Sequence, residues 1–474
     1  MSTMVRFISH SIMFVLTALA ACQLDADEVS FIRDVAPILL GRCAGCHGEK
    51  KTEGGYRLNT FDNLVRPGDS GEQSVVVGKP GDSELFRRVF ESDEELRMPQ
   101  QDDPLSEKEI ATIREWIEAG AKFDGSDREA SLKAILPPRE HPEPPETYRV
   151  AVPVAALAFS PDGTELAVGG HHEIMIWNSD TSQLVRRLKR LPQQIQKLEY
   201  SQDGSTLLVA GGSPGDYGEL CLVDASSGRV VRVFGTFGDI VLDTAFNHDD
   251  SRVVAGSADR SVRVYETAAG RLAWQVSLHA DWITGVDFSH DSRFVVSSSK
   301  DLTAKVYEAD SGTLFTTYNG HQKQYGKYTG RYQIYDVVCS DEGPQVFTAG
   351  QGKTINIWEP EKARGENGTA GDMEQRFAKE GHTKYFEHGY QRKLLVLSVS
   401  NGMVFSASGD GVVKQHDVEA AKLVREYKGH ADWVFAIGYH PARKLAASGS
   451  FDGEVRIWST ESGECLHAFK AMPK

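Results

Sequence analysis

The sequence predicts a protein with two structural classes in one chain: a small all-α domain near the N-terminus, then a larger all-β domain. Three observations lead to this prediction. Residues 28–125 carry apolar residues at helical spacing around a Cys-x-x-Cys-His motif. Residues 126–147 are rich in proline and form a linker. Residues 148–470 repeat a pattern of four short strands about every 46 residues.

The composition narrows the classes of function. The chain has 474 residues, of which 40% are hydrophobic and 25% charged, as in soluble globular proteins. Its formal net charge of −15 argues against nucleic acid as a partner and favours a basic one. The cysteines outside the motif are too few and too scattered for a disulfide framework.

The first 21 residues are expected to form a signal peptide. An apolar run from Ile12 to Ala21 follows Arg6, and it is too short to span a bilayer but suits an export signal. The run ends in Leu-Ala-Ala-Cys, which resembles the bacterial lipobox and makes Cys22 a lipidation candidate. Cleavage at the small residues before Cys22, without a lipid, stays open. We expect an exported protein, periplasmic or lipid-anchored on the outer side of the cytoplasmic membrane or to the outer membrane.

Cys43, Cys46 and His47 form the motif that is typical of c-type haem attachment. Two thiols at this spacing can add to the two vinyl groups of one haem, and the adjacent imidazole can bind the iron. A thioredoxin-like motif would follow a strand within a βαβ unit, and a zinc site would need a second ligand pair. Neither pattern accompanies the motif, so the sequence predicts one covalent haem c.

Three amphipathic segments are expected to form the helices around this haem, at residues 31–42, 83–90 and 107–119. Pro37 lies inside the first segment and should kink the helix or delay its start. Ser106 and Glu109 form a capping box at the start of the third segment. A haem would complete the small apolar core that these helices share.

Met98 is the candidate for the second iron ligand. It lies 51 residues after His47 in a Met-Pro loop between two expected helices. A loop methionine is by itself more often a gap filler. The order of the Cys-x-x-Cys-His motif, Gly-Gly-Tyr-Arg-Leu, Pro-Gly-Asp-Ser-Gly, Met-Pro and Trp-Ile-Glu-Ala-Gly resembles the cytochrome c domain of planctomycete-type secreted proteins. This resemblance implies thioether bonds at Cys43 and Cys46 and axial ligation by His47 and Met98.

The four-strand pattern occurs seven times between residues 148 and 470 and resembles a seven-bladed WD-repeat β-propeller. The clearest unit runs from Trp433 to Phe469. Gly-His pairs, as at His321 and His430, and turn aspartates such as Asp301 recur at the period of the repeat. We interpret them as blade scaffolding, because side chains repeated at blade periodicity need only tie strands together.

Two segments between repeats combine aromatic and basic residues and are candidate docking surfaces for a redox partner protein. They lie at residues 320–334 and 379–393, and solvated loops of incidental composition are the alternative. The docking candidates are Tyr325, Tyr328, Arg331, Tyr332, Tyr385, Phe386, Tyr390 and Arg392.

These features favour single-electron transfer, with the propeller as a docking scaffold and no catalytic residue of its own. Methionine ligation would close the iron to substrate. Two alternatives remain open: an oxidoreductase with an open iron site, and a sensor in which the haem reports redox state. The first would need an open coordination position or a second cofactor, and the sequence shows no second haem motif and no nucleotide fingerprint.

Overall fold

The computed structural model describes residues 29–473, except 49–50, 101–102, 126, 130, 133–138, 326–327, 353, 365–381, 388 and 391. For residues 322–325, 328–329, 363–364 and 382–386 it describes the backbone alone. The chain divides into two compact units, Met1–Pro137 and Pro138–Lys474. No helix in the described part is long and apolar enough to cross a membrane. The expected signal peptide and Cys22 lie outside the described residues.

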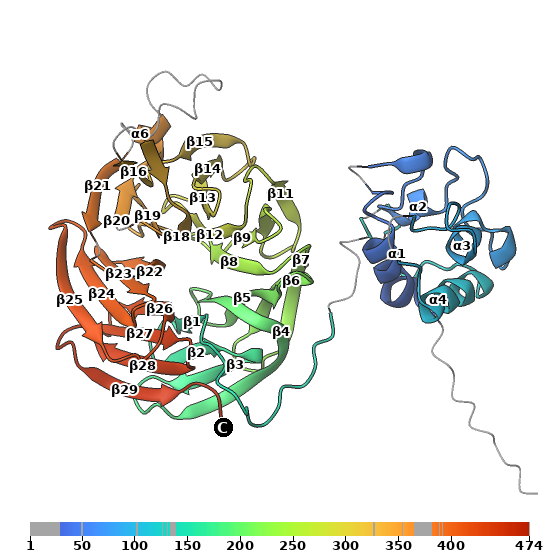
Figure 1. Cartoon of the computed structure of the whole chain (residues 1–474). Coiled ribbons are helices and arrows are strands. Elements are labelled where there is room, and N and C mark those ends of the chain that lie inside the picture. The colour runs from blue at the N-terminus through green and yellow to red at the C-terminus, as the bar shows by residue number, and fades with distance from the viewer. Residues whose placement is uncertain are drawn as a thin grey trace, which may run out of the picture. The chain divides into compact units, whose positions relative to one another are not determined.

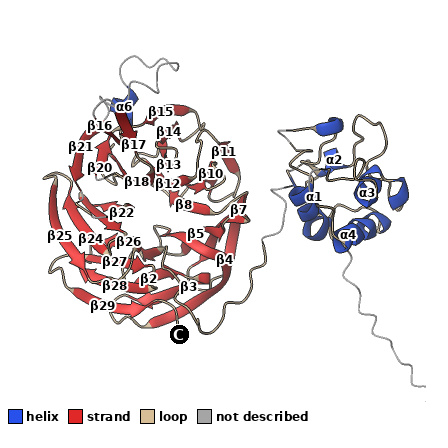
Figure 2. Ribbon diagram, in the orientation of Figure 1, coloured by secondary structure: helices blue, strands red, loops and turns tan. Residues whose placement is uncertain are grey.

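The first unit is built from short helices and connecting loops (Figure 2). They are the π-helical turn Phe31–Val35, α1 (Ala36–Arg42), the 3-10 turns Glu53–Gly55 and Pro80–Asp82, α2 (Phe61–Leu64), α3 (Glu84–Phe90) and α4 (Glu107–Glu118). Pro37 stands in the first turn of α1, where its missing N–H costs nothing. The proline therefore sets the start of α1, and the residues before it form the π-helical turn.

The predicted capping box begins α4. The Ser106 hydroxyl accepts from the Glu109 amide, and the Glu109 carboxylate accepts from the Ser106 amide at 2.7 Å. Ile113, Trp116 and Ile117 of α4 are buried in one apolar core with Phe31. The core packs α4 against the segment that leads into the Cys-x-x-Cys-His motif, so the motif rests on a rigid base.

The second unit consists of antiparallel sheets that follow one another in chain order around a ring (Figure 1). A seven-stranded sheet contains β1 (Leu157–Phe159), β2 (Glu165–Gly169), β3 (His171–Asn178), β4 (Leu184–Tyr200), β5 (Thr206–Ser213), β6 (Tyr217–Asp224) and β7 (Val230–Phe237). Two four-stranded sheets follow: β8 (Val241–Phe246), β9 (Arg252–Ser257), β10 (Val262–Glu266) and β11 (Leu272–Val276), then β12 (Ile283–Phe288), β13 (Phe294–Ser299), β14 (Ala304–Glu308) and β15 (Leu314–Tyr318). This arrangement fits the predicted propeller.

Three more four-stranded sheets continue the ring. They contain β18 (Ile334–Cys339), β19 (Val346–Gly350), β20 (Thr354–Trp358) and β21 (His382–Glu387); β22 (Leu394–Ser400), β23 (Met403–Ser408), β24 (Val412–Asp417) and β25 (Lys422–Lys428); and β26 (Val434–His440), β27 (Leu445–Ser450), β28 (Glu454–Ser459) and β29 (Cys465–Lys470). A hairpin of β16 (Gln322–Tyr325) and β17 (Tyr328–Arg331) and the short helix α6 (Pro360–Arg364) lie between strands of the repeat.

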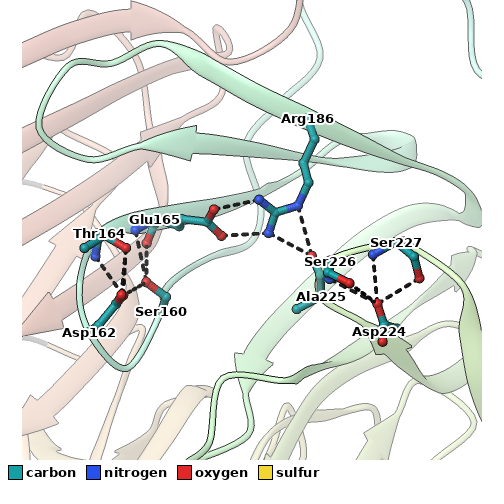
Figure 3. Close-up of polar contacts among 9 residues, drawn as sticks. All are labelled: Ser160, Asp162, Thr164, Glu165, Arg186, Asp224, Ala225, Ser226 and Ser227. Atoms are coloured by element: carbon teal, nitrogen blue, oxygen red, sulfur yellow. Dashed lines mark hydrogen bonds and ion pairs between the residues drawn. The ribbon is translucent and has the colours of Figure 1, made fainter.

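The seven-stranded sheet joins two repeats, because β4 runs without a break from one into the next. Its first part pairs with β3 and its last residues pair with β5. Figure 3 shows how one side chain ties the two repeats together. Arg186 binds both carboxylate oxygens of Glu165 at 2.6 and 2.7 Å and donates to the Ala225 carbonyl at 2.8 Å.

Histidine side chains of two repeats contact polar side chains of neighbouring strands and turns, as expected of blade scaffolding. In the last sheet the Ser448 hydroxyl lies 2.7 Å from His430 Nε2 and accepts from Trp458 Nε1 at 2.8 Å. In an earlier sheet, His279 lies 2.7 Å from the Asp301 carboxylate and 2.8 Å from the Ser297 hydroxyl. These buried contacts tie neighbouring strands together inside each sheet.

Side-chain packing closes the ring. Each terminal sheet carries its own strands, and β1–β3 share one apolar core with β26–β28. The Val154 amide donates to the Ser450 carbonyl at 3.1 Å. The Tyr148 amide donates to the Pro473 carbonyl at 2.9 Å. This hydrogen bond holds the two ends of the unit together.

Candidate functional site

The first unit contains a cavity of about 330 Å³ that brings distant parts of the chain together. Cys43, His47 and Met98 all line it. The remaining lining residues are Glu53, Gly54, Tyr56, Leu58, Gly68, Asp69, Ser70, Ser74, Glu84, Leu85, Arg88 and Val89. The largely apolar wall and the His and Met side chains suit a haem, which needs only two axial ligands from the protein.

The motif forms a tight turn directly after α1. The amides of Cys46 and His47 both donate to the Cys43 carbonyl, at 3.2 and 3.0 Å. A Cβ at Gly48 would lie 2.4 Å from the Ala44 carbonyl oxygen, closer than the backbone tolerates. The turn therefore needs glycine after His47 for a steric reason that the motif pattern does not reveal.

His47 is fixed through its backbone and its ring. Its carbonyl accepts from the Leu58 amide at 2.9 Å, and its ring lies 5.4 Å from the Tyr56 ring in an edge-to-face arrangement. The buried Nδ1 of His47 has no hydrogen-bond partner among the described residues. His47 therefore has a fixed backbone and a ring nitrogen that no described side chain occupies.

Met98 reaches the same cavity from the loop after α3. Its amide donates to the carbonyl of Arg88, on α3, at 2.9 Å. Arg88 also lines the cavity and lies 3.4 Å from the Glu84 carboxylate. This hydrogen bond therefore fixes the backbone of the candidate ligand to helix α3.

The two motif cysteines differ in their surroundings. Burial raises the pKa of the Cys43 thiol to about 11, so this thiol is neutral at physiological pH. Cys46 is not among the residues that line the cavity, and its sulfur lies 3.9 Å from Lys51 Nζ. Among the described residues, no three His, Cys, Asp or Glu side chains are grouped as a metal site would need.

Tyr56 is a site residue that the sequence interpretation did not assign. Its hydroxyl donates to the Leu64 carbonyl at 2.8 Å and lies 2.7 Å from the Ser74 hydroxyl. Burial raises the pKa of Tyr56 well above its usual range, so the hydroxyl stays a neutral donor. The Gly-Gly-Tyr-Arg-Leu segment was the sequence signal that could have pointed to Tyr56.

The predicted docking residues are divided by the structure. Arg331 and Arg392 are exposed and Tyr332 is half-buried. Tyr390 is 5% exposed, and its hydroxyl donates to the Ser406 carbonyl at 2.7 Å. The prediction that Tyr390 presents its ring to a partner is therefore wrong, because the ring belongs to the core between two sheets.

The side chains of the remaining docking candidates are outside the described part, which gives only their backbone. Tyr325 and Tyr328 belong to the β16–β17 hairpin, and Tyr385 and Phe386 belong to β21. The sequence predicts that residues 379–393 lie between two repeats, after the fourth strand of the first one. Residues 382–387 instead form that fourth strand, paired with β20, because the long segment before them postpones its start.

Four carboxylates on inner strands of the ring bind the backbone of the next sheet. Glu199 accepts from the Phe246 amide at 3.1 Å and Asp243 from the Val286 amide at 2.8 Å. The other two contacts are Asp287 with the Cys339 amide at 2.7 Å and Asp336 with the Leu397 amide at 2.6 Å. An acidic residue in the first strand of successive repeats was the sequence signal for these bridges.

One cation stands among these carboxylates. Lys197 Nζ lies 3.0 Å from Asp243. Burial, with a smaller effect of nearby carboxylates, raises the pKa of Asp287 to about 7 and that of Glu199 to about 8. Burial and Asp243 also raise the pKa of Asp336. These raised pKa values predict that the unit loses stability as the pH rises towards neutral.

Comparison with protein families agrees with both units. Residues 43–102 match the family described as planctomycete cytochrome c. Residues 146–178, 228–266, 270–308, 312–359 and 421–459 match the WD domain, G-beta repeat. The chain therefore combines a planctomycete cytochrome c domain with WD40 repeats. The stretches without a match include residues 179–227 and 360–420, and the structure forms strands in both.

Similar curated proteins share parts of the repeat region. The THO complex subunit 6 of Arabidopsis thaliana is 32% identical over 74 residues, which cover 16% of this chain and 20% of that protein. The protein of the same name from Drosophila melanogaster is 40% identical over 65 residues, covering 14% and 18%. The Cross-pathway control WD-repeat protein 2 of Flammulina velutipes is 32% identical over 74 residues, covering 16% and 24%. The chain thus spans a quarter or less of these relatives.

Proposed function

We propose that this protein is an exported c-type cytochrome that transfers single electrons through one covalently bound haem. Cys43 and Cys46 would form the thioether bonds, and His47 and Met98 would be the axial ligands. The single observation that carries this proposal is the cavity that Cys43, His47 and Met98 line together, although Met98 lies 51 residues after His47. Such convergence is what a His/Met-ligated haem requires.

When bound, a haem supplies reversible one-electron chemistry, and its potential follows its ligands and surroundings. The residues of this chain hold the site and exclude water. Leu58, Leu85 and Val89 provide an apolar wall, and Tyr56 keeps its hydroxyl turned to Leu64 and Ser74. A methionine at the second axial position favours electron transfer over substrate chemistry, because it leaves no open coordination position.

We further propose that the ring of sheets is a seven-bladed propeller and serves as the docking scaffold for a redox partner protein. Five four-stranded sheets and one seven-stranded sheet support seven blades if β4 ends one blade and begins the next. No substrate of its own is proposed for this unit, because its recurrent His, Ser and Asp side chains bind one another inside the sheets.

For the N-terminus we propose residues 1–21 as the signal peptide and Cys22 as the site of a lipid anchor. Export suits covalent haem, since bacterial c-type attachment takes place outside the cytoplasm in the family that the sequence resembles. The mature protein would work in the periplasm or on a membrane surface that faces it.

Haem staining on a denaturing gel tests covalent attachment. We expect the exported full-length chain to retain haem after denaturation, and Cys43→Ser or Cys46→Ser to reduce the stain strongly. Cys465→Ser is the matched control, because Cys465 is an exposed, free cysteine of the other unit. Undiminished staining of both motif variants would refute the proposal.

A further inference from the structure

One edge of the ring carries a patch that combines aromatic and basic side chains, which we name the aromatic-basic arc. Its members are Trp282, Lys300, Arg392, Lys393, Trp433 and Phe451. The three aromatic side chains are 41%, 40% and 51% exposed for Trp282, Trp433 and Phe451. Exposed tryptophan is unusual for a surface that has no partner.

The repeat places these aromatic residues at equivalent positions. Trp282 directly precedes β12, and Trp433 directly precedes β26. The Lys300 amide donates to the Trp282 carbonyl at 3.2 Å, and the Phe451 amide donates to the Trp433 carbonyl at 2.8 Å. Both pairs thus stand where the first strand of a sheet begins, on the same edge of the ring.

The strands between these two positions carry further members of the arc. β12, β18, β22 and β26 follow one another around the inside of the ring (Figure 1). Lys393, which precedes β22, places Nζ 5.4 Å from the centre of the Tyr335 ring on β18. Arg392 lies 5.7 Å from the centre of the Trp433 ring.

One cation of the arc lies against an aromatic ring of the arc. Lys300 Nζ lies 3.4 Å from the centre of the Trp282 ring. Partial burial lowers the pKa of Lys300, and the charge of Lys393 lowers it further, while Asp281 opposes both effects.

A cavity that borders residues next to the arc contains carboxylates. A cavity of about 200 Å³ inside the ring is lined by Tyr335 and Phe435 and, further along, by Lys197, Asp243 and Asp336. The carboxylates there already accept backbone hydrogen bonds or pair with Lys197. An acidic ligand would therefore stay at the rim, where the cations are, and would be repelled from the interior.

We propose that the aromatic-basic arc binds an acidic polypeptide segment of a partner protein, with carboxylates on Lys300, Arg392 and Lys393 and apolar side chains against Trp282, Trp433 and Phe451. The complementarity is local, since the chain as a whole has a net charge of −15. This inference rests on the proposed docking role of the propeller. Binding is measured without a redox readout, so its failure would leave the electron-transfer proposal standing.

The test uses the full-length chain and a random copolymer of glutamate and tyrosine as the probe, with binding followed by tryptophan fluorescence. We expect salt-sensitive binding that Lys300→Glu with Lys393→Glu weakens by about tenfold, because two attractions become repulsions. The matched control reverses two exposed cations at the starts of outer strands, Arg271 directly before β11 and Lys422 at the first position of β25, to Glu. Equal weakening by the control would mean general charge attraction and would overturn the proposal.

A second pair of variants tests the aromatic part. Trp433→Ser should weaken binding of the probe by about tenfold, as expected of an exposed aromatic anchor. Leu466 is an exposed residue of β29, and Leu466→Ser should leave binding unchanged. Tighter binding of polylysine than of the acidic copolymer would show a basic occupant. Self-association of the chain that the double reversal abolishes would show a second copy as the occupant, and either result would overturn the proposal.

Discussion

Replacing Asp287 with Asn should stabilise the ring of sheets above neutral pH. The Asp287 carboxylate accepts from the Cys339 amide at 2.7 Å and the Phe288 amide at 2.8 Å, and an amide oxygen can take over one of these contacts. Burial, with Asp243 adding to it, raises the pKa of Asp287 to about 7. The substitution removes the charge that burial penalises and keeps the side chain's size.

The sign and size of this change in folding stability follow from proton linkage. A carboxyl whose pKa is raised on folding binds a proton more readily in the folded state, so stability falls as pH rises from its unfolded value towards its folded one. A rise from 3.8 to about 7 corresponds to at most about 4 kcal/mol at higher pH. Water in the adjoining cavity of about 410 Å³ screens the charge, and the asparagine side chain cannot accept the second of the two backbone hydrogen bonds. We therefore expect a net gain of about 2 kcal/mol.

Thermal unfolding of the full-length chain at pH 6.5 and 8.5, followed by tryptophan fluorescence, measures this effect. The wild type should be less stable at pH 8.5, and Asp287→Asn should raise the melting temperature there by about 4 °C and by less at pH 6.5. Asp162→Asn is the control, because hydrogen bonds from Ser160 and Thr164 lower the pKa of Asp162 to about 2, below the tested range. A destabilised Asp287→Asn variant at pH 8.5, or a wild type that gains stability there, would refute the reasoning.

Three further predictions concern single contacts. Met98→Ala should leave the haem attached but convert the spectrum to one that small ligands change, and an unchanged low-spin spectrum would reject Met98 as a ligand. Gly48→Ala should lower the fraction of chains that stain for haem, because its Cβ would lie 2.4 Å from the Ala44 carbonyl oxygen; normal staining would contradict the tight turn. Arg186→Met should lower the stability of the ring by about 1–2 kcal/mol in urea unfolding, through loss of the paired contacts to Glu165; no change would show that the pair is dispensable.

Local signals in the sequence predicted much of the fold. The capping box at Ser106 and Glu109 defined the start of α4, because both partners lie within one helical turn. The repeat period placed the strands, since each repeat must bury the same faces. Cys43, His47 and Met98 line one cavity, whereas Cys46 does not. The contributions of Tyr56 and Arg88 depend on contacts between segments that no local pattern records.

The errors have physical causes of the same kind. Tyr390 belongs to an aromatic and basic segment, yet its ring fills the core and its hydroxyl binds Ser406, which depends on the neighbouring sheet. The segment from 382 to 387 was expected to follow a strand and instead forms one. The bridges made by carboxylates such as Asp243 and Asp287 join residues 43 and 52 positions apart, so composition alone could not show them.

The central claim is one covalent haem with both axial positions filled by the protein. Visible spectra of the exported full-length chain, oxidised and reduced, test it most directly. The account predicts low-spin spectra in both states, with the weak long-wavelength band of a methionine bound to ferric iron, and no change on adding a small iron ligand at low concentration. A high-spin spectrum that shifts when such a ligand is added, or the absence of haem from the exported chain, would contradict it.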